Sequence, residues 1–210
     1  MGKEVEKSFL GLYCKEIGRE AEKMTLLENI NICGIKHAGK SSAANALAML
    51  LSVHWQDSDD VLREEYSFAA GRNLSVREIY RELGEESFRK FEAKILRKLW
   101  EYDEKGILAL GGGALSNPFL TESDFQNAGL IVCIDVPDKI AFQRILRKGL
   151  PPFLQQEKDP FEAFCRMNAE RRALFEKRAD IVIRADGKST PLSNAEQIWE
   201  ACGKRWKNRG

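Results

Sequence analysis

The chain has 210 residues, of which 43% are hydrophobic and 31% charged, enough for one domain with a substantial core. Its 33 Lys and Arg residues nearly balance its 32 Asp and Glu residues, which argues against a broad nucleic-acid-binding surface. The N-terminus lacks a basic segment followed by an apolar one, and no stretch approaches the ~18 apolar residues of a membrane span. We therefore expect neither export nor membrane insertion.

The five cysteines are scattered along the chain, and no pair of them has C-x-x-C spacing. This pattern predicts neither a disulfide framework nor a zinc site. Reduced thiols are the simplest interpretation, and they predict a cytoplasmic location.

Residues 1–25 differ in pattern from the rest of the chain. They place apolar residues at roughly helical spacing among Lys and Glu, namely Phe9, Leu10, Leu12, Tyr13 and Ile17. The spacing favours an N-terminal helical extension, and a poorly ordered extension is the alternative. Such a helix could mediate self-association, but we expect a monomer whose main domain spans residues 26–210.

The segment Gly34–Ser41 fits the phosphate-binding pattern G-x-x-x-x-G-K-[ST]. It follows a strand-like segment, Asn29–Cys33, and precedes a helix-like one, Ser42–Leu51. Its glycines permit a tight turn whose N–H groups converge on phosphate oxygens at a helix N-terminus. Lys40 can reach the β- and γ-phosphates, and the Ser41 hydroxyl can ligate Mg²⁺.

From residue 29 onward, strand-like and helix-like segments alternate. The expected strands are Asn29–Cys33, Ser52–Gln56, Gly106–Leu110, Leu130–Asp135 and Ile181–Arg184. The expected helices are Ser42–Leu51, Val76–Leu83, Glu85–Glu104, Pro118–Asn127, Pro137–Lys148, Phe161–Arg178 and Asn194–Lys207. This alternation predicts an α/β protein with a parallel sheet covered on both faces. Ligands of such sheets bind beyond the carboxyl ends of the strands.

Two carboxylates, Asp57 and Asp59, follow the second expected strand on an emerging loop. One can hold the hydration shell of Mg²⁺ while the other accepts a hydrogen bond or a proton from a substrate hydroxyl. The alternative is a helix N-cap followed by first-turn acidic residues, which would need no ligand.

Three consecutive glycines, Gly111–Gly113, follow the third expected strand. They favour the close approach of a ligand over a merely flexible turn. Arg89 and Arg171 lie on expected helices, where an arginine is more often solvated or paired with a nearby Glu than in contact with a ligand.

Together these elements resemble the shikimate kinase family over about residues 28–205. The motifs occur in family order, namely the P-loop, Asp57-Ser58-Asp59, Gly71 with Ser75–Ile79, Gly84–Glu92, Gly111–Gly113 and Arg171–Phe175. The resemblance implies a three-layer P-loop kinase fold of the nucleoside-monophosphate-kinase type. It implies a five-stranded parallel sheet of order 2-3-1-4-5, a helical substrate-binding insertion near residues 60–90 and a lid near residues 149–160.

The resemblance also implies roles for residues on the nucleotide side. Six residues would cradle the ATP phosphates: His37, Ala38, Gly39, Lys40, Ser41 and Ser42. Ser41 would ligate Mg²⁺ with help from Asp57, and Arg144 and Lys188 lie where the family holds adenine.

On the acid side, Asp59 matches the carboxylate that holds the hydroxyls of shikimate, and it is the expected catalytic partner of Lys40. Arg89 and Arg171 match the pair that binds the substrate carboxylate, which suits the fork-like geometry of guanidinium groups. Gly112 matches the backbone next to the substrate ring. The implied activity is ATP-dependent phosphorylation of shikimate at the 3-hydroxyl, in chorismate and aromatic amino-acid biosynthesis.

The chain departs from the family pattern at three positions. His37 replaces a small residue, Phe175 replaces a tyrosine, and Pro151 replaces the lid arginine, for which Arg147 or Lys148 could substitute. The missing arginine leaves open a nucleotide-binding paralogue with impaired catalysis, and a kinase of another polyol acid such as gluconate is a further alternative. We expect the two lid prolines to exclude helix from residues 149–154.

Overall fold

The computed structural model describes residue 26 and residues 28–207. The expected N-terminal helix lies outside the described residues. The five strands are β1 (Ile30–Cys33), β2 (Trp55–Asp57), β3 (Ile107–Ala109), β4 (Leu130–Asp135) and β5 (Ile181–Arg184). They form one sheet of order β2-β3-β1-β4-β5 in which every neighbouring pair is parallel, so the predicted order is confirmed.

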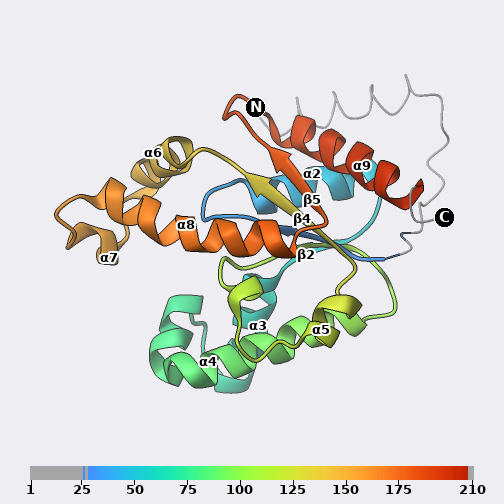
Figure 1. The fold of residues 1–210 in the computed structure, drawn as a ribbon. Coiled ribbons are helices and arrows are strands. Elements are labelled where there is room, and N and C mark those ends of the chain that lie inside the picture. Colours follow the sequence, from blue (N-terminus) through green and yellow to red (C-terminus); the bar gives the residue numbers. More distant parts are fainter. Residues whose placement is uncertain (1–25, 27, 208–210) are drawn as a thin grey trace, which may run out of the picture.

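Helices cover both faces of this sheet. They are α2 (Lys40–Leu51), α3 (Ser58–Ala70), α4 (Val76–Glu101), α5 (Glu122–Asn127), α6 (Asp138–Lys148), α7 (Pro152–Gln155), α8 (Pro160–Arg178) and α9 (Pro191–Lys207), with a 3₁₀ turn η1 (Ala114–Ser116). Helices α2 and α9 lie together on one face, and α4, α5 and α8 lie on the other (Figure 1). The protein therefore has three layers, as the sequence predicts.

The central strand β1 is buried on both faces, although asparagine alternates with isoleucine along it. Asn31 is fully buried, and its Nδ2 donates to the carbonyls of Ala128 at 2.7 Å and Leu130 at 3.3 Å. Its Oδ1 accepts a 2.8 Å hydrogen bond from Nε1 of Trp100 on α4. Because a buried amide must be paired, these bonds fix α4 and the turn before β4 to the strand that leads into the P-loop.

The segment around β2 differs from the prediction. Helix α2 ends in a left-handed turn at Ser52, with φ of 54°, so the strand begins only at Trp55. The expected loop after the strand is instead the start of helix α3, with Asp57 as its N-cap and Asp59 in its first turn. Asp59 is thereby held on a rigid element.

Helix α4 matches two predicted helices, because Gly84 interrupts it with φ of 73° and ψ of 169°. Its first turn carries a capping box between Ser75 and Glu78. The predicted helix Pro118–Asn127 begins only at Glu122, because Thr121 and Asp124 form a capping box there.

The prediction that the lid prolines exclude helix is wrong. A single helical turn, α7, begins at Pro152 with Pro151 as its N-cap. Proline is compatible with the first position of a helix, because the N–H that it lacks has no partner there. Gly149, with φ of 94°, ends the preceding helix α6 and separates it from α7.

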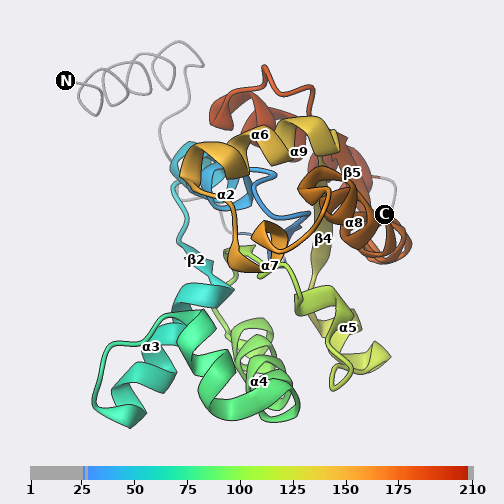
Figure 2. The same ribbon diagram turned by 90° about the vertical axis from the view of Figure 1, so that its left-hand side faces the viewer.

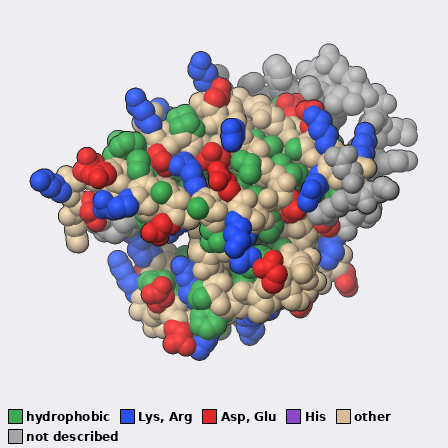
Figure 3. Space-filling model, viewed as in Figure 1, with side chains coloured by type: hydrophobic (Ala, Val, Ile, Leu, Met, Phe, Trp, Pro, Cys, Tyr) green, Lys and Arg blue, Asp and Glu red, His purple; other side chains and the backbone are tan. Residues whose placement is uncertain are grey.

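The carboxyl ends of the strands face the viewer in Figure 2. At this end of the sheet, the α3–α4 hairpin and the α6–α7 segment lie on opposite sides of the P-loop. Basic and acidic side chains are interspersed over the face shown in Figure 3. None of the helices in the described part of the chain combines the length and apolar character of a membrane span.

Candidate active site

The P-loop leaves β1 through backbone conformations that its sequence constrains. A Cβ at Gly34, with φ of 145°, would lie 2.5 Å from the carbonyl oxygen of Ile134, so only glycine fits there. Gly39, with φ of 100°, is the N-cap of α2. His37 occupies the left-handed region with φ of 65°, which explains why a small residue is usual in this position in the family that the chain resembles.

Lys40 begins α2 and folds back over the loop. Its Nζ donates to the carbonyls of Gly34 at 3.2 Å and Ile35 at 3.3 Å. Burial lowers the pKa of Lys40, an effect that the nearby carboxylates of Asp59 and Asp57 oppose. The N-terminus of α2 has neither a side-chain cap nor a first-turn acidic residue, so its N–H groups suit an anion such as phosphate.

Asp57 joins the P-loop to the start of α3. Its Oδ1 accepts a 3.0 Å hydrogen bond from the amide of Asp59, as an N-cap does. Its Oδ2 accepts a 2.6 Å hydrogen bond from the Ser41 hydroxyl. The N-cap interpretation is confirmed, and the second carboxylate oxygen of Asp57 faces the P-loop through Ser41. The magnesium role of Asp57 stays a prediction.

Asp59 points from the first turn of α3 toward the loop after β3. Burial raises the pKa of Asp59 to about 6, and the nearby carboxylates of Asp57 and Glu92 add to this rise. The positive charge of Lys40 opposes the rise. The amide of Gly111 donates a 2.8 Å hydrogen bond to Oγ of Ser58, which holds the two segments together. A Cβ at Gly111 would collide with Oδ1 of Asp59.

Arg89 lies on α4 with its guanidinium next to Gly113 of this loop. Its Nη1 donates a 2.8 Å hydrogen bond to Oε2 of Glu92, a buried carboxylate that also accepts from Nδ2 of Asn117 at 2.9 Å. A Cβ at Gly113 would collide with Nη1 of Arg89. Arg89 is thus paired with a Glu on its own helix, as is common for a helical arginine, and the bond to Glu92 orients its guanidinium.

Arg171 is half-buried on α8, and within the described residues its guanidinium has no carboxylate partner. Burial lowers the pKa of Arg171, and the positive charge of Arg89 adds to this effect. A Cβ at Gly112 would lie 4.0 Å from Nη1 of Arg171. The three glycines therefore face Asp59, Arg171 and Arg89 in turn, and protein side chains come close at Gly111 and Gly113. The approach of a ligand to this loop stays a prediction.

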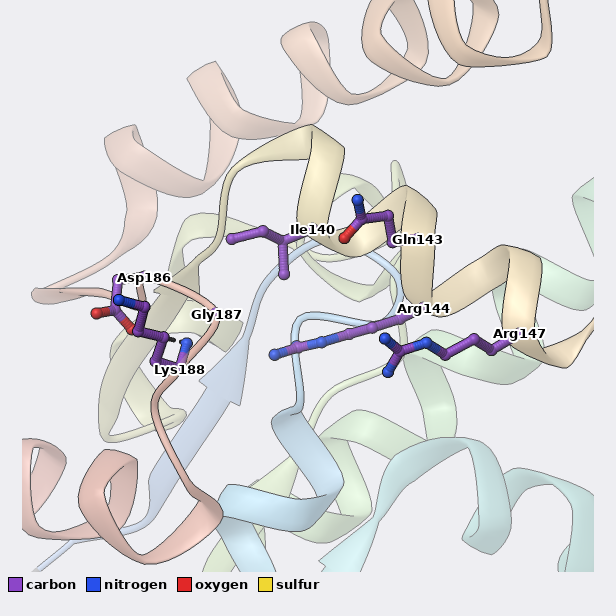
Figure 4. Close-up of a pocket in the computed structure, with 7 residues that line it drawn as sticks. All are labelled: Ile140, Gln143, Arg144, Arg147, Asp186, Gly187 and Lys188. Carbon is purple, nitrogen blue, oxygen red and sulfur yellow. Dashed lines mark hydrogen bonds between the residues drawn. The ribbon is translucent and has the colours of Figure 1, made fainter.

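A pocket of about 230 Å³ lies beside the P-loop, between α6 and the loop after β5 (Figure 4). It is lined by Ile140, Gln143, Arg144, Arg147, Asp186, Gly187 and Lys188. Arg144 Nη1 donates to the carbonyls of His37 at 3.0 Å and Ala38 at 3.3 Å. The Asp186 carboxylate accepts from the backbone amides of Lys188 and Ser189, so it shapes its own loop.

Sequence reasoning missed the supporting roles of Asn117 and Ser58, and it treated pairing of Arg89 with a Glu as an alternative to a ligand role. Glu92 and Asn117 orient Arg89, and Ser58 joins the Asp59 turn to Gly111. A carboxylate three residues after an arginine on a helix was the available signal for Glu92. Nothing local in the sequence distinguishes Ser58 or Asn117, because their partners lie far away in the chain.

A parallel sheet of order 2-3-1-4-5, a P-loop after its central strand, and a helical hairpin facing that loop define a P-loop kinase. A family model described as "Shikimate kinase" matches residues 36–203. A shikimate kinase of Tolumonas auensis is 33% identical over 175 residues, which cover 83% of this chain and 96% of that protein. The chain belongs to the shikimate kinase family.

Solved structures agree with this assignment. A shikimate kinase from Bacteroides thetaiotaomicron is 27% identical and superposes with a TM-score of 0.70, over 84% of this chain and 98% of that one. A shikimate kinase from Acinetobacter baumannii in complex with shikimate has a TM-score of 0.72 at 24% identity, over 89% of this chain and 98% of that one. The second likeness concerns the fold alone.

Proposed function

We propose that this protein transfers the γ-phosphoryl group of ATP to the 3-hydroxyl of shikimate, a step of chorismate and aromatic amino-acid biosynthesis. One observation carries the proposal. Asp59, Arg89 and Arg171 converge on Gly111–Gly113 from three separate helices, next to the P-loop. Membership of the shikimate kinase family supports the same activity.

Arg89 and Arg171 bind the carboxylate of the acid substrate in this proposal. Two guanidinium groups lie beside adjacent glycines of one loop, and of the two only Arg89 has a carboxylate partner within the described part of the chain. An incoming carboxylate relieves the repulsion between them and forms charge-assisted hydrogen bonds with both. The pair therefore selects an acid over a neutral polyol.

Asp59 accepts the proton of the attacking hydroxyl. A carboxylate with a pKa of about 6 is ionised at neutral pH but is a stronger base than an exposed aspartate. The hydroxyl oxygen attacks the γ-phosphorus in line, the bond from that phosphorus to the β–γ bridging oxygen breaks, and the proton moves to Asp59. Lys40 balances the charge on the transferring group, and positioning supplies most of the remaining rate.

Ser41 and Asp57 fit a magnesium ion that accompanies ATP. Their Oγ and Oδ2 atoms lie 2.6 Å apart, and hydroxyl and carboxylate oxygens are hard donors that Mg²⁺ prefers. Within the described residues there is no cluster of three or more His, Cys, Asp or Glu side chains that could hold a metal. This suits an ion that takes most of its ligands from phosphates and water. When bound, Mg²⁺ neutralises phosphate charge.

The nucleotide base occupies the pocket in Figure 4, against Arg144 and near Lys188. Arg144 is fixed to the P-loop carbonyls, so its guanidinium plane can stack on a purine next to the phosphate cradle. The segment 149–160, which contains α7, is the lid in this proposal, and α3 with the first half of α4 is the substrate-binding insertion. A cytoplasmic location and a monomeric state stay predictions.

Release of ADP in the presence of shikimate, quinate or gluconate tests the function. We expect rapid release with shikimate and little with the other two acids. Millimolar shikimate without ADP release would contradict the proposal and favour a paralogue with impaired catalysis. Faster release with gluconate would favour the third alternative.

A further inference from the structure

Two adjacent arginines on α8 have opposite surroundings. Arg171 has no carboxylate partner within the described residues, whereas each guanidinium nitrogen of Arg172 donates a hydrogen bond. Nε of Arg172 donates to Oδ1 of Asp135 at 2.9 Å, and Nη1 donates to Oδ2 of Asp138 at 2.6 Å. Its Nη2 donates to the carbonyl of Val136. Arg172 is therefore fully engaged with one short stretch of chain.

That stretch is the junction between the sheet and the nucleotide side of the site. Asp135 is the last residue of β4, and Asp138 is the first residue of α6. Asn168, fully buried one turn before Arg172 on α8, also donates from Nδ2 to Oδ1 of Asp138, at 3.3 Å. Two residues on one face of α8 thus hold the helix against this junction.

The rotation of α8 links the two arginines. Successive residues project about 100° apart around a helix axis, so a fixed direction for Arg172 also fixes the direction of Arg171. In this rotation Nη1 of Arg171 lies next to Gly112, and α8 packs against η1, which follows the glycines. A rotated α8 would turn the guanidinium of Arg171 away from the acid site.

Such a constraint is needed because Arg171 and Arg89, two cations, lie beside adjacent glycines of the same loop, Gly112 and Gly113. Before the acid substrate binds, repulsion between the two guanidinium groups favours conformations in which Arg171 turns away. Arg172 opposes this tendency because two carboxylates and a carbonyl hold it in one geometry.

We propose that Arg172 is a positioning residue whose bonds to Asp135 and Asp138 fix the rotation of α8 and thereby hold Arg171 in place for the carboxylate of the acid substrate. The inference rests on the proposed function, in which Arg171 binds that carboxylate. It assigns to Arg172 no contact with substrate.

The test compares KM for shikimate, KM for ATP and kcat in Arg172→Met, Arg171→Met and the double variant. We expect Arg172→Met to raise KM for shikimate about fivefold or more and KM for ATP by less than about twofold. In the Arg171→Met background, the same substitution should leave KM for shikimate unchanged. Arg172→Lys keeps one charge-assisted contact and should therefore raise KM for shikimate less than Arg172→Met does. If Arg172→Met does not fold, Arg172→Lys provides the test in its place.

Arg97 supplies a matched control for loss of a structural ion pair. Its guanidinium also binds a carboxylate with two nitrogens, Asp124 at 2.8 and 2.9 Å, and it also donates to a carbonyl, that of Phe119. Arg97→Met should lower the melting temperature, but it should not raise KM for shikimate more than KM for ATP.

Two outcomes would overturn the inference. One is that Arg172→Met raises KM for shikimate and KM for ATP equally. The other is that Arg172→Met raises KM for shikimate as much in the Arg171→Met background as in the wild type. If Arg171→Met itself leaves KM for shikimate unchanged, the proposed acid site is wrong, which is a separate result.

Discussion

The carboxylate of Asp59 lies against the backbone of Gly111. A Cβ at position 111 would be 3.1 Å from Cγ of Asp59 and closer still to Oδ1. Gly113 has the same relationship to Arg89, and Gly112 lies next to Arg171. The candidate active site thus depends on a loop without side chains, which leaves room for three charged groups from separate helices.

Gly111→Ala should displace Asp59 and impair catalysis while the fold is retained. A shift of about 1 Å in a reacting group can lower the rate by about 100-fold, so we expect a loss of that order in kcat/KM for shikimate. Steady-state ADP release measures the loss. KM for ATP should change little, because the P-loop is not moved.

Gly203→Ala is the control for this substitution. Gly203 lies within α9, where an added Cβ would meet nothing within 4 Å. It should keep full activity and gain slightly in stability, since alanine is the better helix former. A Gly111→Ala enzyme as active as Gly203→Ala would show that Asp59 is not held by the glycine loop.

Arg171→Met should weaken the acid substrate far more than ATP. Loss of one partner of a charge-assisted pair in a closed site costs about 2–5 kcal/mol, which we expect in KM for shikimate. Arg166→Met is the matched control, because Arg166 is an exposed arginine on the same helix with only 3.9 Å ion pairs. Equal effects on the KM values of both substrates would place Arg171 on the nucleotide side.

The raised pKa of Asp59 makes the ionised carboxylate a cost to stability. Between pH 4 and 6 the unfolded chain loses the proton before the folded one does, so this residue lowers stability as pH rises through that range. Asp59→Asn should therefore stabilise the metal-free protein at pH 7.5, by on the order of 1–3 kcal/mol. The gain should shrink at pH 5.

Denaturant unfolding of both proteins at the two pH values measures this difference. The sign is the informative part, because most substitutions destabilise a protein and Asp59 is half-buried. A loss of stability at pH 7.5 would mean that Asp59 is well accommodated as an anion.

Arg147 is a candidate for the positive charge that position 151 lacks. It is an exposed residue of α6 that lines the pocket in Figure 4, one turn after Arg144. We expect Arg147→Ala to lower kcat by more than about tenfold, or ~1.4 kcal/mol of barrier. Lys139→Ala, which removes an exposed cation from the same helix, should have no effect on kcat.

Pro151→Arg gives the complementary measurement. If Arg147 supplies the charge, this substitution should change kcat little. A rise in kcat of more than about tenfold, with Arg147→Ala silent, would favour the paralogue with impaired catalysis.

Much of the fold follows from the sequence, because its alternating pattern and P-loop fix a parallel sheet and the family resemblance supplies the strand order. The start of α3 was harder to place. Asp57-Ser58-Asp59-Asp60 suits both a loop and a helix N-terminus, and only the bond from the Asp59 amide to Asp57 distinguishes them. The turn of α7 was missed because two prolines suggest a helix breaker although proline suits a first position.

In the candidate site, too, some residues can be predicted from the sequence, whereas others need the structure. The P-loop pattern alone predicts the role of Lys40, whereas the family resemblance is needed to expect Asp59, Arg89 and Arg171 at the site. The role of Arg172 needs the rotation of α8 and the packing of β4 against it, and these depend on contacts more than 30 residues apart in sequence. Adjacent arginines look alike in a sequence, whereas the fold gives them different partners.

The most direct measurement is a ³¹P NMR spectrum of protein incubated with ATP, Mg²⁺ and shikimate. The proposed function predicts a new phosphomonoester signal that couples to the proton on carbon 3 of shikimate, together with stoichiometric ADP. Lys40→Ala should give neither. ATP and shikimate left unchanged by the wild-type protein, or a phosphate at a different hydroxyl, would contradict the proposed function.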